Sequence, residues 1–78
     1  MSLYDDVLEI AREYMGIAAK DYIDRRCRIV LRGEAPETIT TAHLDRLVVG
    51  VGMTAKGYIG ERKTEDFKSQ LEALKKRG

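Results

Sequence analysis

Apolar and polar residues follow helical spacing along the first half of the chain, but the apolar side changes at Gly16. Before Gly16 the apolar stripe lies opposite a charged face, and its members are Leu3, Val7, Ile10, Ala11 and Tyr14. After Gly16 the members are Ala19, Ile23, Cys27, Val30 and Leu31. At about 100° per residue the stripe rotates by roughly 150°, which one straight helix on one core does not allow. The pattern predicts helices over about 3–15 and 17–32, with left-handed geometry at Gly16 between them.

Two more helices are predicted in the second half of the chain. Gly33 and Pro36 end the second helix, because glycine suits the position after a helix and proline prevents its resumption. A third helix over about 41–59, capped by Thr40 or Thr41, has an apolar stripe made of Leu44, Leu47, Val48, Val51, Ala55, Tyr58 and Ile59. Gly60 ends this helix. Thr64 is expected to cap a fourth helix over about 65–77, which buries Phe67, Leu71 and Leu74.

The expected fold class is therefore all-α, with four short helices in a single small bundle-like domain over 1–78. Dimerisation is expected to complete it, because a domain of 78 residues retains only a few kcal/mol of net stability. An α+β alternative stays open, since segments 27–32 and 47–51 are rich in β-branched residues. Helices are preferred because Asp21/Arg25 and Asp24/Arg28 place acid before base at four-residue spacing.

Composition points to an intracellular protein. The single Cys27 has no partner for a disulfide within the chain, which favours a reducing cytoplasm. No secretory signal and no membrane-length apolar run is recognised, so no membrane association is expected. Net charge is +1, but residues 1–24 carry 2 basic and 6 acidic residues, and residues 25–32 carry 4 basic residues and no acidic one. Such blocks favour association between unlike surfaces over binding through one broad basic face.

The segment from Leu8 to Ile23 resembles a small helical module found C-terminal to kinase and other signalling domains in bacteria. In that module a helix ends in an aromatic-aliphatic-glycine run, as Tyr14-Met15-Gly16 does here. The next helix there starts with proline-alanine, whereas this chain has Ile17 at the proline position. Segments 36–47 and 64–74 look like its second pair of helices. The resemblance implies an interaction or regulatory unit without catalytic residues.

Few residues suggest chemistry of their own. Cys27 lies among arginines that would favour a thiolate, and this keeps a small enzyme or thiol-based redox sensor as an alternative. Cys27 also falls on the apolar stripe, and burial as a small hydrophobe is the preferred interpretation. His43 has no neighbouring Cys, Ser or second His, so it is expected at the surface or at a helix start. No catalytic residue, cofactor or metal ligand is therefore assigned.

Three other patterns in the sequence are candidate binding sites. Basic residues of the second helix form the candidate nucleic-acid contact, and they are Arg25, Arg26, Arg28 and Arg32. Because Asp21 and Asp24 share that face, an internally paired surface is preferred. The acidic positions Asp6, Glu9 and Glu13 are expected to be solvated. The run 50–55 matches the form G-x-G-x-x-A of a dinucleotide-binding fingerprint, but the chain leaves no room for a complete βαβ nucleotide site.

The side of the third helix opposite its main apolar stripe is the basis for predicting a function. Small and apolar residues lie opposite its main stripe, and they are Val49, Gly50, Met53, Thr54 and Gly57. Interior glycines cost roughly 1 kcal/mol each relative to alanine, so a close approach by another helix would explain them. The sequence thus predicts a non-catalytic protein-interaction or regulatory module, homodimeric or bound to another protein through this surface. Nucleic-acid binding is the main alternative.

Overall fold

A computed structural model describes residues 2–77, which fold into helices joined by short turns, with no strand in that range. The first two helices are α1 (Leu3–Met15) and α2 (Ala19–Val30), joined by a 3₁₀ turn at Gly16–Ala18. After the loop come α3 (Leu44–Thr54), the one-turn α4 (Lys56–Ile59) and α5 (Glu61–Arg77). The predicted all-α fold is confirmed, and both suspected strand segments lie in or beside helices.

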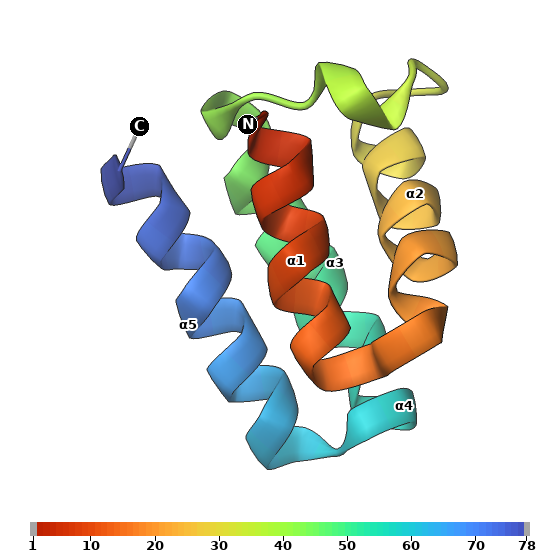
Figure 1. The fold of residues 1–78 in the computed structure, drawn as a ribbon, viewed down its shortest axis with the longest axis vertical. Coiled ribbons are helices and arrows are strands. Elements are labelled where there is room, and N and C mark those ends of the chain that lie inside the picture. Colours follow the sequence, from red (N-terminus) through yellow and green to blue (C-terminus); the bar gives the residue numbers. More distant parts are fainter. Residues whose placement is uncertain (1, 78) are drawn as a thin grey trace.

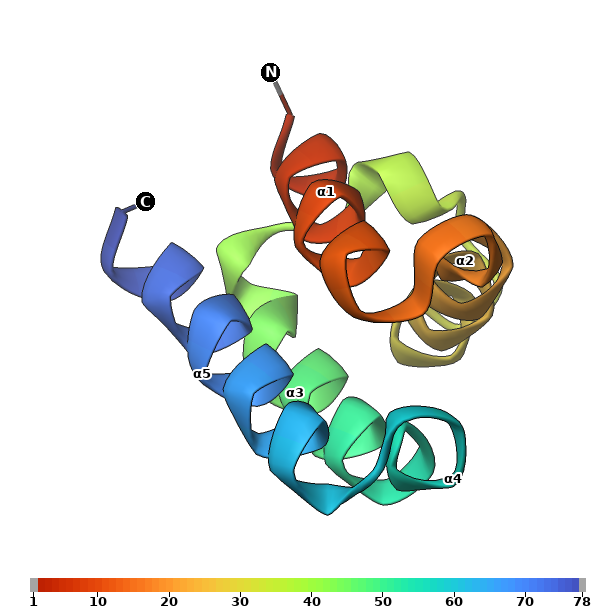
Figure 2. The same ribbon diagram turned by 60° about the horizontal axis from the view of Figure 1, so that its bottom comes forward.

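Each of the four main helices contacts two neighbours (Figure 1). α1 packs against α2 and α5, and α3 contacts the same two helices from the other side. The start of α1 and the end of α5 lie at one end of the molecule, and the corner between α1 and α2 lies at the opposite end, near α4 (Figure 1). The turned view shows α3 and α5 side by side, with α4 at the end of α3 (Figure 2). The arrangement brings residues on either side of Gly16 next to the α3–α4 junction.

One hydrophobic core lies between the four helices. The buried apolar side chains are Tyr4, Val7, Leu8, Ala11, Ala19, Ile23, Cys27, Leu31, Ile39, Leu44, Leu47, Val48, Val51, Ala55, Phe67, Leu71 and Leu74. The buried face of α1 is centred on Tyr4 and Leu8 as well as Val7 and Ala11, so it is shifted from the predicted stripe. Tyr14 stacks on Phe67 with ring centroids 5.2 Å apart, which joins α1 to α5.

The break at Gly16 is confirmed, but its geometry differs from the prediction. Gly16 has φ 58° and ψ −129°, whereas a left-handed helical residue would have a positive ψ. This conformation corresponds to the first central position of a type II′ turn, which glycine dominates. The chain then makes one 3₁₀ turn before α2 begins, and α2 therefore starts two residues later than predicted, at Ala19.

The start of α1 and the end of α2 follow ordinary capping chemistry. The Asp5 amide donates to the Ser2 hydroxyl at 3.2 Å, and the Ser2 amide donates to the Asp5 carboxylate at 3.4 Å. At the other end Arg32 and Gly33 have positive φ values, and the Gly33 amide donates to the Arg28 carbonyl at 2.8 Å. This closure ends α2 at Val30, two residues before the predicted boundary.

The predicted helix over 41–59 is divided in the structure. Thr41–His43 form a 3₁₀ turn, α3 ends at Thr54, and α4 follows Ala55. The Thr54 hydroxyl donates to the Gly50 carbonyl at 2.8 Å, a back-bond that often bends helices. The Tyr58 amide then bonds the Ala55 carbonyl three residues back, at 2.9 Å. This change of direction leaves Tyr58 exposed, contrary to its predicted place on the buried stripe.

The fourth helix begins earlier than predicted, and Thr64 does not cap it. α5 starts at Glu61, directly after Gly60, which has φ 85° and turns the chain sharply. Thr64 is fully buried inside the helix, and its hydroxyl donates to the Gly60 carbonyl at 2.7 Å. The hydroxyl is thus satisfied by the preceding turn, which allows a polar side chain in the core.

We expect Gly16→Ala to lower the free energy of unfolding by about 1–3 kcal/mol, because alanine is strained at this φ and ψ. Urea denaturation followed by circular dichroism measures the change. Gly57→Ala is the matched control: Gly57 is helical, a new Cβ there meets nothing within 4 Å, and the substitution should stabilise by about 0.5 kcal/mol. A stabilising Gly16→Ala would contradict the assigned backbone conformation.

Candidate binding groove between α2 and α4

A groove of about 510 Å³ opens where the α1–α2 corner faces the α3–α4 junction. Its lining residues come from both halves of the chain: Tyr14, Met15, Ala18, Asp21, Tyr22, Arg25, Arg26, Thr54, Tyr58 and Ile59. The volume falls within the range of about 300–1,000 Å³ that is usual for ligand sites. Three tyrosines and two arginines meet there, so the groove combines aromatic surface with positive charge.

Tyr22 forms the centre of the groove and ties α2 to α3. The Thr54 hydroxyl donates to the Gly50 carbonyl, so the Tyr22 hydroxyl donates to the Thr54 oxygen, at 2.6 Å. Tyr58 meets the Tyr22 ring edge to face, with centroids 5.7 Å apart and planes at 67°. Burial raises the pKa of Tyr22, although the Thr54 hydrogen bond and nearby Arg26 act to lower it. Tyr22 is therefore a protonated donor at neutral pH.

Two arginines border the groove, and they differ in burial. Arg26 is half-buried, and its side chain lies over Gly50 of α3; a Cβ built on that glycine would lie 3.6 Å from the Arg26 Cδ. Arg25, at the preceding position of α2, is exposed. Within residues 2–77 neither guanidinium forms an ion pair, and the ion pairs in that range are Lys20–Asp24, Lys68–Glu65 and Lys75–Asp45. The charge of Arg25 and Arg26 is therefore available to a ligand.

The predicted interface residues lie on different sides of α3 and α4. Gly50 and Thr54 are half-buried beside α2, and the side chains that approach them are Arg26 and Tyr22 of the same chain. Val49 and Met53 lie on the outer side of α3 and are 61% and 77% exposed. Gly57 is exposed on α4. The close approach inferred for the glycines is thus made at Gly50 by Arg26 of the same chain, while Val49 and Met53 face outward.

The candidate nucleic-acid contact is also divided. Arg25 and Arg26 border the groove, whereas Arg28 lines a separate hollow that Arg25 also borders. Arg32 lies beyond the end of α2 and has a positive φ. The predicted Asp24/Arg28 pair is wrong, because Asp24 bonds Lys20 one turn earlier, at 2.9 Å. No ion pair joins Asp21 to Arg25 in the part of the chain that the structure describes.

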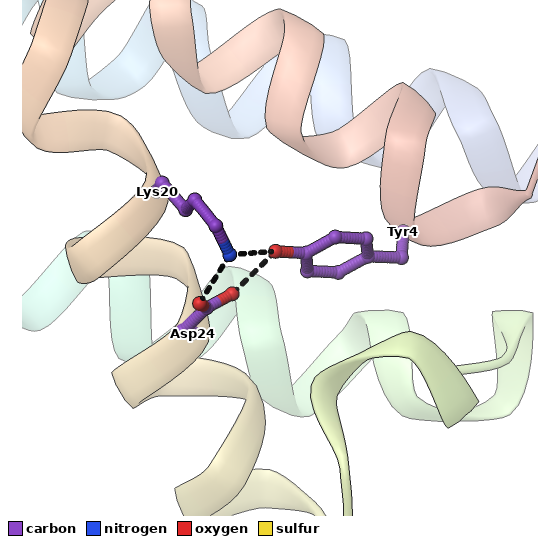
Figure 3. Close-up of polar contacts among 3 residues, drawn as sticks. All are labelled: Tyr4, Lys20 and Asp24. Atoms are coloured by element: carbon purple, nitrogen blue, oxygen red, sulfur yellow. Dashed lines mark hydrogen bonds and ion pairs between the residues drawn. The ribbon is translucent and has the colours of Figure 1, made fainter.

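Tyr4 of α1 and Lys20 of α2 both donate hydrogen bonds to Asp24 (Figure 3). The Tyr4 hydroxyl donates to the Asp24 carboxylate at 2.5 Å, and the Lys20 amine donates to both Asp24 and the Tyr4 oxygen. Desolvation acts to raise the pKa of Asp24, but the hydrogen bonds from Tyr4 and Lys20 and the charges of Lys20 and Arg28 lower it overall. Desolvation and the bond to Asp24 raise the pKa of Tyr4. This cluster joins α1 to α2 across 20 residues of sequence.

Cys27 packs in the core, and His43 takes part in the hydrogen bonding at a helix start. Cys27 is fully buried, as predicted, and desolvation with the charges of Asp24 and Glu37 raises the pKa of its thiol to about 11. The thiolate is therefore strongly disfavoured at neutral pH. His43 lies at the start of α3, where its Nδ1 accepts from the Thr40 amide at 3.0 Å. His43 thus stabilises a helix start, one of the two places expected for it.

The other sequence patterns concern dinucleotide binding, metal binding and membrane spanning. The run 50–55 lies within and just after α3, so the strand that a dinucleotide-binding motif needs is replaced by helix. Among residues 2–77 no group of three or more His, Cys, Asp or Glu side chains is arranged to hold a metal. None of the helices in the same range has the length and hydropathy to cross a lipid bilayer.

Sequence reasoning missed the groove because its aromatic residues are far apart in the chain. Tyr22 and Tyr58 are separated by 36 positions, and helical spacing predicts that Tyr58 lies on the buried stripe. No local sequence pattern marks the contact between the two tyrosines, because it forms only when α2 packs against the α3–α4 junction. Comparison of the chain with protein-family models, with curated proteins and with solved structures found no match.

We expect Asp24→Asn to lower the free energy of unfolding by about 1 kcal/mol at neutral pH, which is below the usual contribution of charged hydrogen bonds because water screens the exposed Lys20. The folded state lowers the pKa of Asp24, so its contribution is present above the ordinary value of 3.8 and is lost as pH falls through the folded value. Urea denaturation between pH 7 and pH 3 should show the two proteins converging in acid. Asp21→Asn, on the exposed side of α2, is the control and should change less.

We expect Cys27 to react with a disulfide reagent at least about 100-fold more slowly than an exposed thiol, because burial and the raised pKa both suppress attack. The exposed reference is Ser69→Cys in a Cys27→Ala background. Absorbance of the released thiol measures both rates in native buffer and in concentrated guanidinium chloride, where the rates should become similar. Equal rates in native buffer would restore Cys27 as a reactive residue.

Proposed function

We propose that this chain is a non-catalytic helical association module that forms a homodimer through the outer side of α3. The observation that carries the proposal is the pair Val49 and Met53, which lie one turn apart on α3 and are 61% and 77% exposed. Large apolar side chains grouped on one helix face indicate a contact surface more strongly than single exposed ones. A second copy presenting the same pair would cover both in a symmetric contact.

The energetics of a small domain support this proposal. Buried residues of α3 such as Leu47 and Val51 belong to the core that α3 shares with α2 and α5. Val49 and Met53 stay exposed, and Val49 borders a hollow that Lys75 and Lys76 of α5 also line. Burying apolar area stabilises by about 25 cal/mol per Å², so pairing two such faces adds stability that one small core lacks.

Other features are consistent with association in a regulatory or scaffold role in the cytoplasm. Cys27 is single, buried and protonated, as expected where thiols stay reduced. His43 and Cys27, the side chains best suited to act as base or nucleophile, both have structural surroundings. The residues around Gly16 that resemble a helical module of bacterial signalling proteins point to the same class of function.

Single-stranded nucleic-acid binding is the second candidate. It is favoured by one observation: Tyr58 lies beside Tyr22, and both line a groove with Arg25 and Arg26. Aromatic platforms next to cations are typical of single-strand binding. Asp21 lines the same groove, however, and Arg28 and Arg32 lie outside it, which weakens a continuous phosphate track.

We expect light scattering to give a mass near twice the 8.8 kDa of one chain at high concentration, with a midpoint of thermal unfolding that rises with concentration. The double variant Val49→Lys/Met53→Lys should remain helical and scatter as a monomer, because facing ammonium groups repel and lose the apolar contact. Ile29→Lys, which changes a side chain 59% exposed on α2, is the matched control and should stay dimeric. A parent protein that remains at 8.8 kDa at high concentration would disprove the homodimer.

A further inference from the structure

We infer that the groove between α2 and α4 binds a short acidic segment of a partner protein, one that places a large apolar side chain next to a carboxylate. The apolar side chain would lie against Tyr22 and Tyr58, and the carboxylate would pair with Arg25 and Arg26. This site is separate from the outer side of α3, so it does not depend on dimerisation. The protein would thus bind an acidic peptide segment in addition to forming the proposed homodimer.

The shape and chemistry of the groove call for an apolar group. Its wall includes the side chains of Met15, Ala18 and Ile59, together with the rings of the tyrosines. Tyr58 is 68% exposed although it touches Tyr22, so most of its surface remains open to a ligand. Aromatic residues of this kind are frequent anchors in protein interfaces, because they supply large contact area at low entropic cost.

The charge beside the apolar wall selects an anion. Arg25 and Arg26 border the groove, and among residues 2–77 no carboxylate pairs with either of them. Arg26 is half-buried beside Gly50, so its side chain has less freedom to lose on binding than a fully exposed arginine has. Guanidinium groups bind carboxylates through paired hydrogen bonds, which gives an acidic side chain a defined position.

A peptide fits these residues better than a nucleic acid does. Asp21 also lines the groove, and its negative charge would repel a run of phosphates more than it would repel a single carboxylate held by the two arginines. Only two arginines reach the groove, whereas binding along a backbone needs a cation at every few nucleotides.

The test is selection of random peptides displayed on phage against the intact protein, followed by fluorescence polarisation. We expect enriched peptides to share an aromatic or large aliphatic residue next to Asp or Glu. The most enriched peptide should bind Tyr58→Ala about tenfold and Arg25→Gln about fivefold more weakly than the parent protein. Ile29→Ala and Arg46→Gln change exposed residues outside the groove and should bind normally.

Several results would overturn the inference. They are a selection without enriched sequences, enrichment of basic peptides, and equal binding by parent, Tyr58→Ala and Arg25→Gln. Tighter binding of a labelled oligothymidylate, lost steeply with salt and competing with the peptide, would assign the groove to nucleic acid instead. The Val49→Lys/Met53→Lys variant should bind the peptide as the parent does, so failure of the homodimer proposal can be told apart from failure of this one.

Discussion

The backbone of Gly16, with φ 58° and ψ −129°, reverses the chain between α1 and α2 within one 3₁₀ turn. Because only glycine adopts this conformation readily, the reversal depends on one residue without a side chain. It folds α1 back along α2, which brings Tyr4 to Asp24 and forms a hydrogen-bonded cluster that includes Lys20 (Figure 3). The same reversal places Met15 and Ala18 on the wall of the groove.

A second change of direction completes the groove from the other half of the chain. The Thr54 hydroxyl bonds the Gly50 carbonyl, and the chain turns after α3 so that Tyr58 lies against Tyr22. A straight continuation of α3 would carry Tyr58 toward the core, as its helical spacing predicts. Thr54 therefore has two roles, because its oxygen also accepts the Tyr22 hydrogen bond that fixes α2 on α3.

Glycines in α3 are explained in part by contacts inside the chain. Arg26 lies along Gly50, and the stem of Lys68 lies near Gly52, where an added Cβ would come within 3.2 Å of the lysine Cδ. Long basic side chains can bury their methylene groups on such bare backbone while their charged ends reach water. What remains unexplained by these contacts is the outward pair Val49 and Met53, and the proposed homodimer depends on that pair.

The sequence by itself determined the four main helices, the break at Gly16 and the burial of Cys27, because helical periodicity and the freedom of glycine are local properties. It did not determine the division of the third helix, since a threonine back-bond competes with the helix without altering the apolar pattern. It also mispaired Asp24 with Arg28, because Tyr4 reaches Asp24 only after α1 folds back on α2. The groove was decided by tertiary structure alone, since packing brings Tyr22 and Tyr58 together across 36 positions.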